Sequence, residues 1–438
     1  MFERLTSIRP QMTVGVLLLV MMVGCGPSAD PESAAGATAS LTEAATVVGS
    51  ATASATAVAT AASTSSPPPP TATPPPSATA DPPTPAPADD EPLFHSPEYG
   101  VQAFLWWRPD IALRDLGLVQ ELGFGWVKQS FAWRDIETLQ KGSYDWYRSD
   151  LIVDEVEQAG LKLLVRLDRQ PFWAQADPAS PLENAPPADL SDFSDFCGVL
   201  AERYRGRIAA YQIWNEPNLS REWGGQPPDA GEYVALLSVC AEAIRTADPE
   251  AIIVSAGLAP TGTGLPVAVP DAVFLQEMYD AGAAAHFDAL GVNAPGYKAP
   301  PEVSPDEAAD TPAYGGGRWF AFRHVEDLRA IMEANGDADK QVVVLEMGWT
   351  TDQLNPDYTW HAVTETEQAE YLVRAYQWAA EHWRPWIGLM VTIYIADYDW
   401  TAETHEQWWW AITLPDGTRR PAFHALAEME KVDDASPE

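Results

Sequence analysis

The sequence predicts one (β/α)8 barrel, an α/β fold, that follows a long linker. Short apolar runs alternate with longer amphipathic segments from about residue 93 onward, which is the pattern of repeated βα units. The short runs number eight, and several are nearly continuous in Val, Ile and Leu, as expected of parallel strands that are buried on both faces. About 340 residues carry this pattern, which is enough for eight units in one domain.

Each predicted strand is a short apolar run bounded by glycine, proline or polar residues. The eight predicted strands are Val101–Leu105, Trp126–Phe131, Lys162–Leu167, Ile208–Ile213, Ala251–Ser255, Ala289–Val292, Val342–Leu345 and Gly388–Ile395.

Helices are predicted where apolar residues recur at helical spacing. The predicted helices are Ser149–Ala159, Ser191–Tyr204, Ala230–Thr246, Trp319–Ala334, Glu365–His382 and Pro421–Glu430. The first of them ends before Gly160, a natural C-cap. A doubly wound open sheet is the alternative fold, but its dinucleotide fingerprint is missing, because Gly262-Thr263-Gly264 lacks the third glycine.

The N-terminus carries a targeting signal. Arg4 and Arg9 precede an apolar run that is too short to span a bilayer and is typical of a signal peptide. The run ends in Met22–Cys25, which resembles the bacterial lipobox, whose cysteine becomes the lipidated first residue of the mature protein. We therefore predict a signal peptide at 1–25 and an extracytoplasmic protein anchored to the membrane or cell surface through Cys25. An ordinary secretory signal is the alternative.

Residues 26–92 separate this signal from the predicted domain at 93–438. They are dominated by Ala, Thr, Ser and Pro, and have too little large apolar surface to offset the entropy of folding. We expect an extended linker that is stiffened by proline.

The charge of the chain excludes some partners. The 26 basic and 63 acidic side chains give a formal net charge of −37, whereas binding to nucleic acid or to an anionic membrane surface needs basic patches. The sequence shows no metal-ligand spacing, so we expect no metal and no cofactor. A monomer that takes a carbohydrate substrate and touches the membrane only through its lipid is expected.

Two cysteines remain besides Cys25. Cys197 and Cys240 both fall in predicted helices. They could form a disulfide in an oxidising compartment, or remain two small buried thiols.

Two glutamates stand where predicted strands end, which is where parallel barrels place their chemistry. Glu216 follows the strand Ile208–Ile213, and Pro217 prevents that strand from continuing. Glu346 follows the run Val342–Leu345, where a carboxylate is costly unless it is paired. Glycoside hydrolysis needs two such carboxyl groups, and a separation of about 5–5.5 Å marks the retaining mechanism.

The segment Tyr211–Asn218, together with a glutamate at the end of the seventh strand, resembles glycoside hydrolase clan A, most of all family 39 and cellulase-like members of family 5. The segment Asp416–Phe423 is also similar to sequences of that group. The resemblance implies that Glu216 is the acid/base, that Glu346 is the nucleophile, and that Asn215 hydrogen-bonds the sugar 2-hydroxyl.

The sequence departs from this clan at several positions. Lys128 lies near the end of the second strand, where clan members often carry arginine. Asn293 takes the place of a histidine after the sixth strand, and we expect Tyr297 to donate a hydrogen bond to Glu346. The chain also has no room for the β-sandwich of family 39 xylosidases, which favours endo action in an open groove.

Tryptophan is abundant, with 18 residues, and its ring can stack on the C–H faces of sugars. Several tryptophans stand at or just after predicted strand ends and are candidate substrate contacts: Trp133, Trp173, Trp223, Trp349 and Trp400. We expect Trp349, three residues after Glu346, to stack on a sugar.

These observations predict a retaining glycosidase that cleaves a β-linked poly- or oligosaccharide. A non-catalytic surface glycan-binding protein with a degenerate barrel is the alternative. A barrel enzyme for phosphorylated substrates is disfavoured, because no glycine-rich phosphate loop is present.

Overall fold

The computed structural model describes residues 92–178 and 182–432. The predicted signal peptide, Cys25 and all of the predicted linker except residue 92 lie outside the described residues. Within them, eight parallel strands pair in sequence order and close into a barrel through β8 and β1. The strands are β1 (Glu98–Gln102), β2 (Trp126–Ala132), β3 (Lys162–Asp168), β4 (Ala210–Ile213), β5 (Ile252–Val254), β6 (Ala289–Pro295), β7 (Gln341–Gly348) and β8 (Ile387–Thr392).

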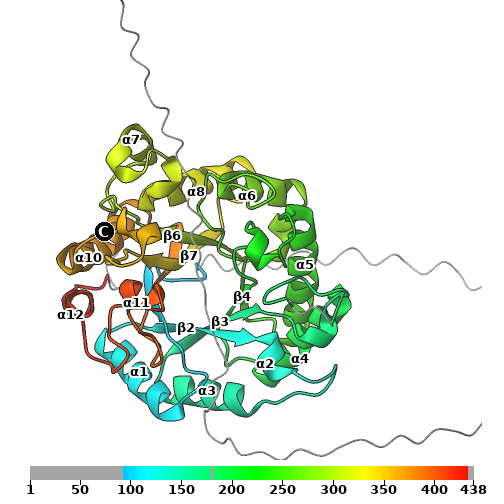
Figure 1. Ribbon diagram of the computed structural model, residues 1–438. Coiled ribbons are helices and arrows are strands. Elements are labelled where there is room, and N and C mark those ends of the chain that lie inside the picture. The colour runs from blue at the N-terminus through cyan, green and yellow to red at the C-terminus, as the bar shows by residue number, and fades with distance from the viewer. Residues whose placement is uncertain (1–91, 179–181, 433–438) are drawn as a thin grey trace, which may run out of the picture. The chain divides into compact units, whose positions relative to one another are not determined.

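Helices surround the strands, as Figure 1 shows, so the predicted (β/α)8 barrel is confirmed. The α-helices are α1 (Pro109–Glu121), α2 (Trp133–Ile136), α3 (Tyr147–Gln158), α4 (Leu190–Arg203), α5 (Ala230–Ala247), α6 (Asp271–Asp280), α7 (Pro305–Asp310), α8 (Val325–Ala334), α9 (Pro356–Thr359), α10 (Glu365–His382), α11 (Gln407–Trp410) and α12 (Pro421–Glu428). The 3-10 turns that concern the site are η2 (Ser220–Glu222), η5 (Arg318–Phe320) and η6 (Phe322–His324).

Most predicted helices match observed ones, and α10 has the predicted bounds. Its start is fixed by a capping box, in which Thr364 accepts from the Glu367 amide while Glu367 accepts from the Thr364 amide. The predicted helix Trp319–Ala334 is too long, because its first part forms η5 and η6 and only α8 is α-helical. Helices α1 and α6 were not predicted, although the proline at or just before each start is a helix signal.

The apolar core has two layers, because side chains alternate across the strands. Residues such as Val127 and Val165 face the surrounding helices, whereas Trp126, Leu164 and Val343 fill the barrel interior. This division explains why the strands read as continuous apolar runs.

The N-terminal end of the barrel is closed by Phe94. Its ring is buried against Trp126, and its backbone amide and carbonyl are both bonded by the Gln341 side chain. Gly388 leaves space for this ring, since a Cβ there would lie 2.7 Å from it. A functional site is therefore expected at the opposite end of the barrel, where the loops that follow the strands lie.

A disulfide joins Cys197 on α4 to Cys240 on α5, which resolves the two alternatives that the sequence left open. The Cα atoms of the pair are 5.4 Å apart. The bridge therefore fixes two neighbouring helices of the outer ring to each other.

Candidate functional site

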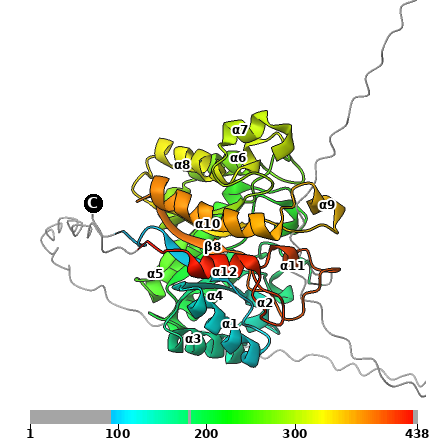
Figure 2. The ribbon, with the colours of Figure 1, turned by 90° about the vertical axis from the view of Figure 1, so that its left-hand side faces the viewer.

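The site lies at the C-terminal end of the strands, which we call the mouth. Short helices in the loops that follow β7 and β8 mark this end, and Figure 2 shows α9 and α11 on the same side of the molecule. Glu216 follows β4 and Glu346 lies in β7, so both predicted carboxylates belong to the mouth.

The backbone after β4 turns sharply to present Glu216. Trp214 and Glu216 both have positive φ, at 73° and 41°, a conformation that costs energy for residues other than glycine. Packing holds this turn, because the Trp214 ring is buried and its Nε1 donates to the Glu222 carbonyl at 3.0 Å. The amide of Glu216 donates to the Gly257 carbonyl at 3.1 Å, which ties the turn to the loop after β5.

Glu346 points into the mouth because β7 contains an irregularity. Val292 pairs with Val344, but the next residue, Asn293, pairs with Glu346, so Leu345 has no partner in the β6 register. Leu345 fills the barrel interior and Glu346 faces the same side, which strict alternation would forbid. This single extra residue in β7 turns the carboxylate toward the barrel axis.

Asn293 connects the two carboxylates. Its backbone is level with Glu346, and its Nδ2 donates to Glu216 Oε1 at 3.0 Å. Asn293 Oδ1 is buried and has no hydrogen-bond partner among the described residues. It packs against Gly257, where a Cβ would lie 2.2 Å from this oxygen. The position that the sequence assigned to Asn293 is therefore beside both glutamates.

Two cations compensate the charge of Glu346. Lys128 on β2 lies 3.3 Å from Glu346 Oε1 and donates to the Leu345 carbonyl, and Arg166 on β3 lies 3.7 Å from the same carboxylate oxygen. Burial lowers the pKa of Lys128 to about 8, and the Glu346 charge acts against this shift. Arg166 also donates to Asn215 Oδ1 at 3.2 Å, which places Asn215 beside the predicted nucleophile.

Glu216 has a different environment. Its Oε2 accepts from Arg221 on η2 at 2.6 Å. Burial raises the pKa of Glu216 to about 7, with Arg221 lowering it and the Glu346 and Glu222 carboxylates raising it. Both carboxylates thus lie beside cations, but burial and the neighbouring carboxylates leave the pKa of Glu216 above its usual range despite Arg221.

A third carboxylate, Glu406, lies near the mouth in the loop after β8. Burial raises its pKa to about 8, its Oε2 accepts from Trp410 Nε1 at 2.7 Å, and its Oε1 lacks a partner within the described part of the chain. Tyr394, after β8, feels the charges of these glutamates, since burial and then Glu346 and Glu406 raise its pKa well above the usual range.

The structure corrects several predicted substrate contacts. Trp349 is fully buried, packs against Phe322 and donates from Nε1 to the Ala299 carbonyl, so it offers no face to a sugar. Trp133 is also fully buried and donates to Glu137. Both rings follow strand ends but point outward, toward the helices.

Tyr297 does not donate to Glu346 as predicted. Its hydroxyl donates to the Pro260 carbonyl at 3.2 Å, and its ring packs between Phe320 and His361. Trp360, which was not predicted, stacks parallel to this ring and is 37% exposed.

The remaining predicted tryptophans are partly or fully covered. Trp173 is half-buried and donates to the Glu137 carbonyl, and Trp223 is buried and donates to Glu232. Trp400 packs edge-on against Tyr394, which brings it to the mouth, but little of its ring is exposed.

Sequence reasoning missed Arg166, Arg221, Glu406 and Tyr394. A signal for Arg166 was present, because an arginine inside a buried strand needs an acidic partner, here Asp168 at 2.9 Å. Arg221 and Glu406 lie in loops, where no periodicity indicates which side chains face the mouth.

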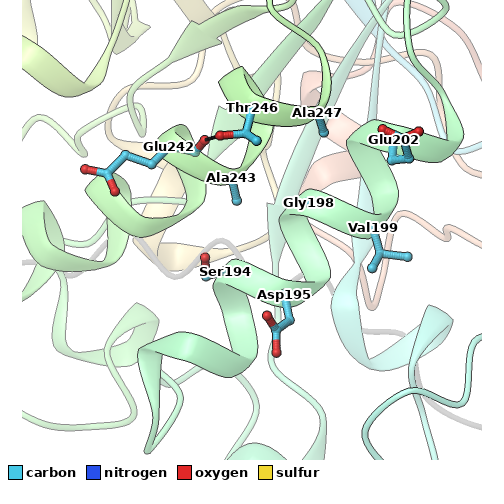
Figure 3. Close-up of a pocket in the computed structure, with 9 residues that line it drawn as sticks. All are labelled: Ser194, Asp195, Gly198, Val199, Glu202, Glu242, Ala243, Thr246 and Ala247. Carbon is cyan, nitrogen blue, oxygen red and sulfur yellow. Dashed lines mark hydrogen bonds between the residues drawn. The ribbon is translucent and has the colours of Figure 1, made fainter. Parts of the chain in front are cut away.

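A surface groove lies away from the mouth, between the outer faces of α4 and α5 (Figure 3). Among its lining residues, Asp195, Glu202 and Glu242 are acidic, and Gly198 lets α4 approach Ala243 on α5. No cluster of side chains within residues 92–178 and 182–432 could hold a metal ion. None of the helices described in those ranges is both long and apolar enough to cross a membrane.

No protein-family model matches the sequence, and no curated protein matches it either. Solved structures do. A family 39 glycoside hydrolase from Bacteroides cellulosilyticus WH2 aligns with a TM-score of 0.54 at 20% identity, over 77% of this chain and 63% of that one. A GH5_18 structure from Streptomyces cattleya, in complex with GlcNAc, aligns with a TM-score of 0.54 at 16% identity, over 77% of this chain and 80% of that one.

A glucosidase from Croceicoccus marinus aligns with a TM-score of 0.52 at 14% identity, over 77% of this chain and 66% of that one. This chain thus spans less than two thirds of the length of that glucosidase and of the family 39 enzyme. The structures include the two families that the sequence resembles. The described part of this chain therefore has the (β/α)8 barrel fold of these glycoside hydrolases.

Proposed function

We propose that this protein is a retaining glycoside hydrolase that cleaves a β-linked poly- or oligosaccharide. The observation that carries the proposal is the arrangement of Glu216 and Glu346 around Asn293, with each carboxylate paired with cations of its own. A raised pKa suits Glu216 to donate a proton, and the cations beside Glu346 suit it to attack as a carboxylate.

The reaction has two steps in this proposal. Glu346 attacks the anomeric carbon and forms an ester as the glycosidic C–O bond breaks, and the Glu216 proton passes to the leaving oxygen. Water then attacks the same carbon, Glu216 accepts its proton, and Glu346 leaves as a carboxylate. Asn215, which Arg166 holds beside Glu346, is placed to bind a sugar hydroxyl.

We infer that Trp360 provides a sugar-stacking surface. It is exposed and lies parallel to Tyr297, and the Tyr297 hydroxyl interacts electrostatically with Glu216. Trp400, beside Tyr394, is a second candidate contact. An exposed ring at the edge of the mouth fits the C–H face of a sugar.

The test is a screen of the whole chain against β-linked polysaccharides and aryl β-glycosides, with release of reducing ends as the readout. Glu346→Gln should abolish turnover and Glu216→Gln should reduce it, whereas Glu381→Gln on the exposed face of α10 should leave it unchanged. Proton NMR of the first-formed anomer tests retention. A fully active Glu346→Gln variant would end the assignment.

The burial of the carboxylates favours one alternative, a non-catalytic glycan-binding protein. Glu216 and Glu346 are only 1% and 4% exposed, so a sugar reaches them only if side chains at the mouth move. Isothermal titration with the same glycans separates the two functions. Binding of an oligosaccharide without release of reducing ends by the unmodified protein would support the alternative.

We also propose that the protein works outside the cytoplasm, anchored by a lipid on Cys25. The Cys197–Cys240 disulfide supports an oxidising compartment. Mass spectrometry of the mature N-terminus, with Cys25→Ser as the comparison, tests the anchor. An unmodified Cys25 in the mature protein would contradict it.

A further inference from the structure

Arg221 covers the proposed acid/base. It extends from η2, five residues after Glu216, and its Nη2 donates to Glu216 Oε2 at 2.6 Å. Its side chain is 21% exposed, whereas that of Glu216 is 2% exposed, so Arg221 lies between the carboxylate and solvent. Glu222 pairs with the Arg221 Nε at 3.4 Å and is held in turn by Asn184.

This contact favours the ionised form of Glu216, whereas burial favours the protonated form. Oε1 of Glu216 accepts from Asn293 and Oε2 accepts from Arg221, so both oxygens act as acceptors. A guanidinium has no acceptor and stays charged at all ordinary pH values, and its short bond to a carboxylate is of the charge-assisted kind. The Arg221 contact therefore stabilises Glu216 in the ionised form, which is the form that acts as a base.

Other charged and titratable groups face Glu216 from the neighbouring elements. Glu222 on η2 and Glu346 on β7 oppose ionisation of Glu216, and burial acts in the same direction. The phenols of Tyr297, after β6, and Tyr394, after β8, also interact with its charge. If Glu346 is consumed in an ester, one of the two opposing carboxylates loses its charge while Arg221 remains.

We propose that Arg221 is a positioning residue that holds Glu216 as a carboxylate for the second, water-activating step of the reaction. The inference rests on the proposed function. In the first step Arg221 must yield Oε2 to the proton and to the leaving oxygen, which requires its side chain to move away. In the second step the guanidinium returns to the ionised carboxylate, beside which the attacking water loses its proton.

The test compares Arg221→Met, which removes the charge, with Arg221→Lys, which keeps it. The alkaline limb of kcat/KM reports the protonated acid/base of the free enzyme. We expect this limb to move up by at least about one pH unit in Arg221→Met, the shift that loss of a close opposite charge produces, and to return toward that of the unmodified protein in Arg221→Lys. Arg205→Met, at an exposed ion pair, is the control and should leave the limb in place.

A second readout separates the two steps. With an activated aryl glycoside, whose leaving group needs no acid, hydrolysis of the glycosyl-enzyme limits kcat. Arg221→Met should then lower kcat by about tenfold, since the base is less well held, and lower kcat/KM much less. An alkaline limb and a kcat that both match the unmodified protein would overturn the inference.

The role of Arg221 can also be tested without measuring activity. Carboxyl carbon-13 NMR of the whole protein labelled at glutamate, with Glu216→Gln to assign the signal, follows the titration of Glu216 directly. Its midpoint should rise in Arg221→Met, or in Arg221→Gln if the methionine variant does not fold. An unmoved midpoint refutes the role of Arg221, whereas an unmodified protein that releases no sugar refutes the proposed function.

Discussion

The Lys128 ammonium lies 3.3 Å from Glu346 Oε1, and both side chains are almost completely buried. The pair is compensated further by Arg166 and Asp168, so two cations and two carboxylates share the interior of the mouth. Such a group is stable only when all four side chains are present, because removal of one member leaves an unpaired buried charge.

Lys128→Met therefore should lower the free energy of unfolding by about 3 kcal/mol, the cost of breaking a buried pair. On a substrate found by the screen, it should also lower kcat/KM by roughly 100-fold, because Glu346 loses its nearest cation. Chemical denaturation and initial rates measure the two effects. Lys162→Met, at an exposed pair with Glu98, should change stability by less than about 1 kcal/mol.

Glu216→Gln should change stability in a pH-dependent way. The pKa of Glu216 is about 7 in the folded protein, above its ordinary value of 4.5, so the folded state binds this proton more tightly. The resulting stabilisation is complete below pH 4.5 and is lost as pH rises to about 7. The variant should thus gain more in melting temperature over the unmodified protein at pH 8 than at pH 4. An equal difference at both values would contradict the raised pKa.

His324 should stabilise the packing of α6 against α8. Here the buried group is a cation that lies between two carboxylates. Its two ring nitrogens lie 3.0 Å from Asp271 and 2.8 Å from Asp327. Burial alone would lower the pKa of His324, but the two carboxylates raise it to about 9. This contribution is complete below the ordinary value of 6.5 and disappears as pH rises through about 9.

His324→Gln should accordingly cost about 3 kcal/mol of unfolding free energy at pH 6 and clearly less at pH 10. Urea denaturation at the two pH values measures this. His382→Gln, at an exposed position on α10, is the matched control and should show no such pH dependence. A His324→Gln cost that is the same at pH 10 as at pH 6 would show that the imidazolium is not the stabilising form.

Trp360 and Trp349 should respond differently to alanine. Trp360→Ala removes an exposed ring at the mouth and should raise KM about fivefold, which corresponds to one aromatic contact of about 1 kcal/mol. Trp349→Ala empties a fully buried position and should lower the free energy of unfolding by about 3–5 kcal/mol. Kinetics and denaturation on both variants check that Trp360 binds substrate and that Trp349 belongs to the core. An unchanged KM for Trp360→Ala would show that Trp360 does not contact the substrate.

The barrel and the two glutamates were predictable because local rules determine them. Valine-rich runs and strand-ending residues mark where strands stop, and the parallel closed topology brings those ends together. Glu216 and Glu346 needed no knowledge of long-range contacts to be placed at the mouth.

The direction of side chains beyond a strand end was not predictable in the same way. Trp349 follows Glu346 by three residues and points to the helices, because an odd number of residues along the pleat places two side chains on opposite faces of a strand. Arg221 reaches Glu216 only through the conformation of the turn after β4, where two non-glycine residues have positive φ. Such turns depend on contacts with other segments, here the Glu222 carbonyl in the next turn and the distant Gly257 carbonyl.

The unmatched Leu345 in β7 makes the number of residues in that strand as important as their identity. Removing one residue between Val342 and Leu345 would move every residue beyond the deletion back by one place. Leu345 would then turn toward the surrounding helices, and Glu346 would take the place of Leu345 in the barrel interior, about 3.3 Å below its present level, with every proposed catalytic side chain still present in the sequence. A deletion of one codon in this strand would therefore be more damaging than many substitutions at the mouth itself.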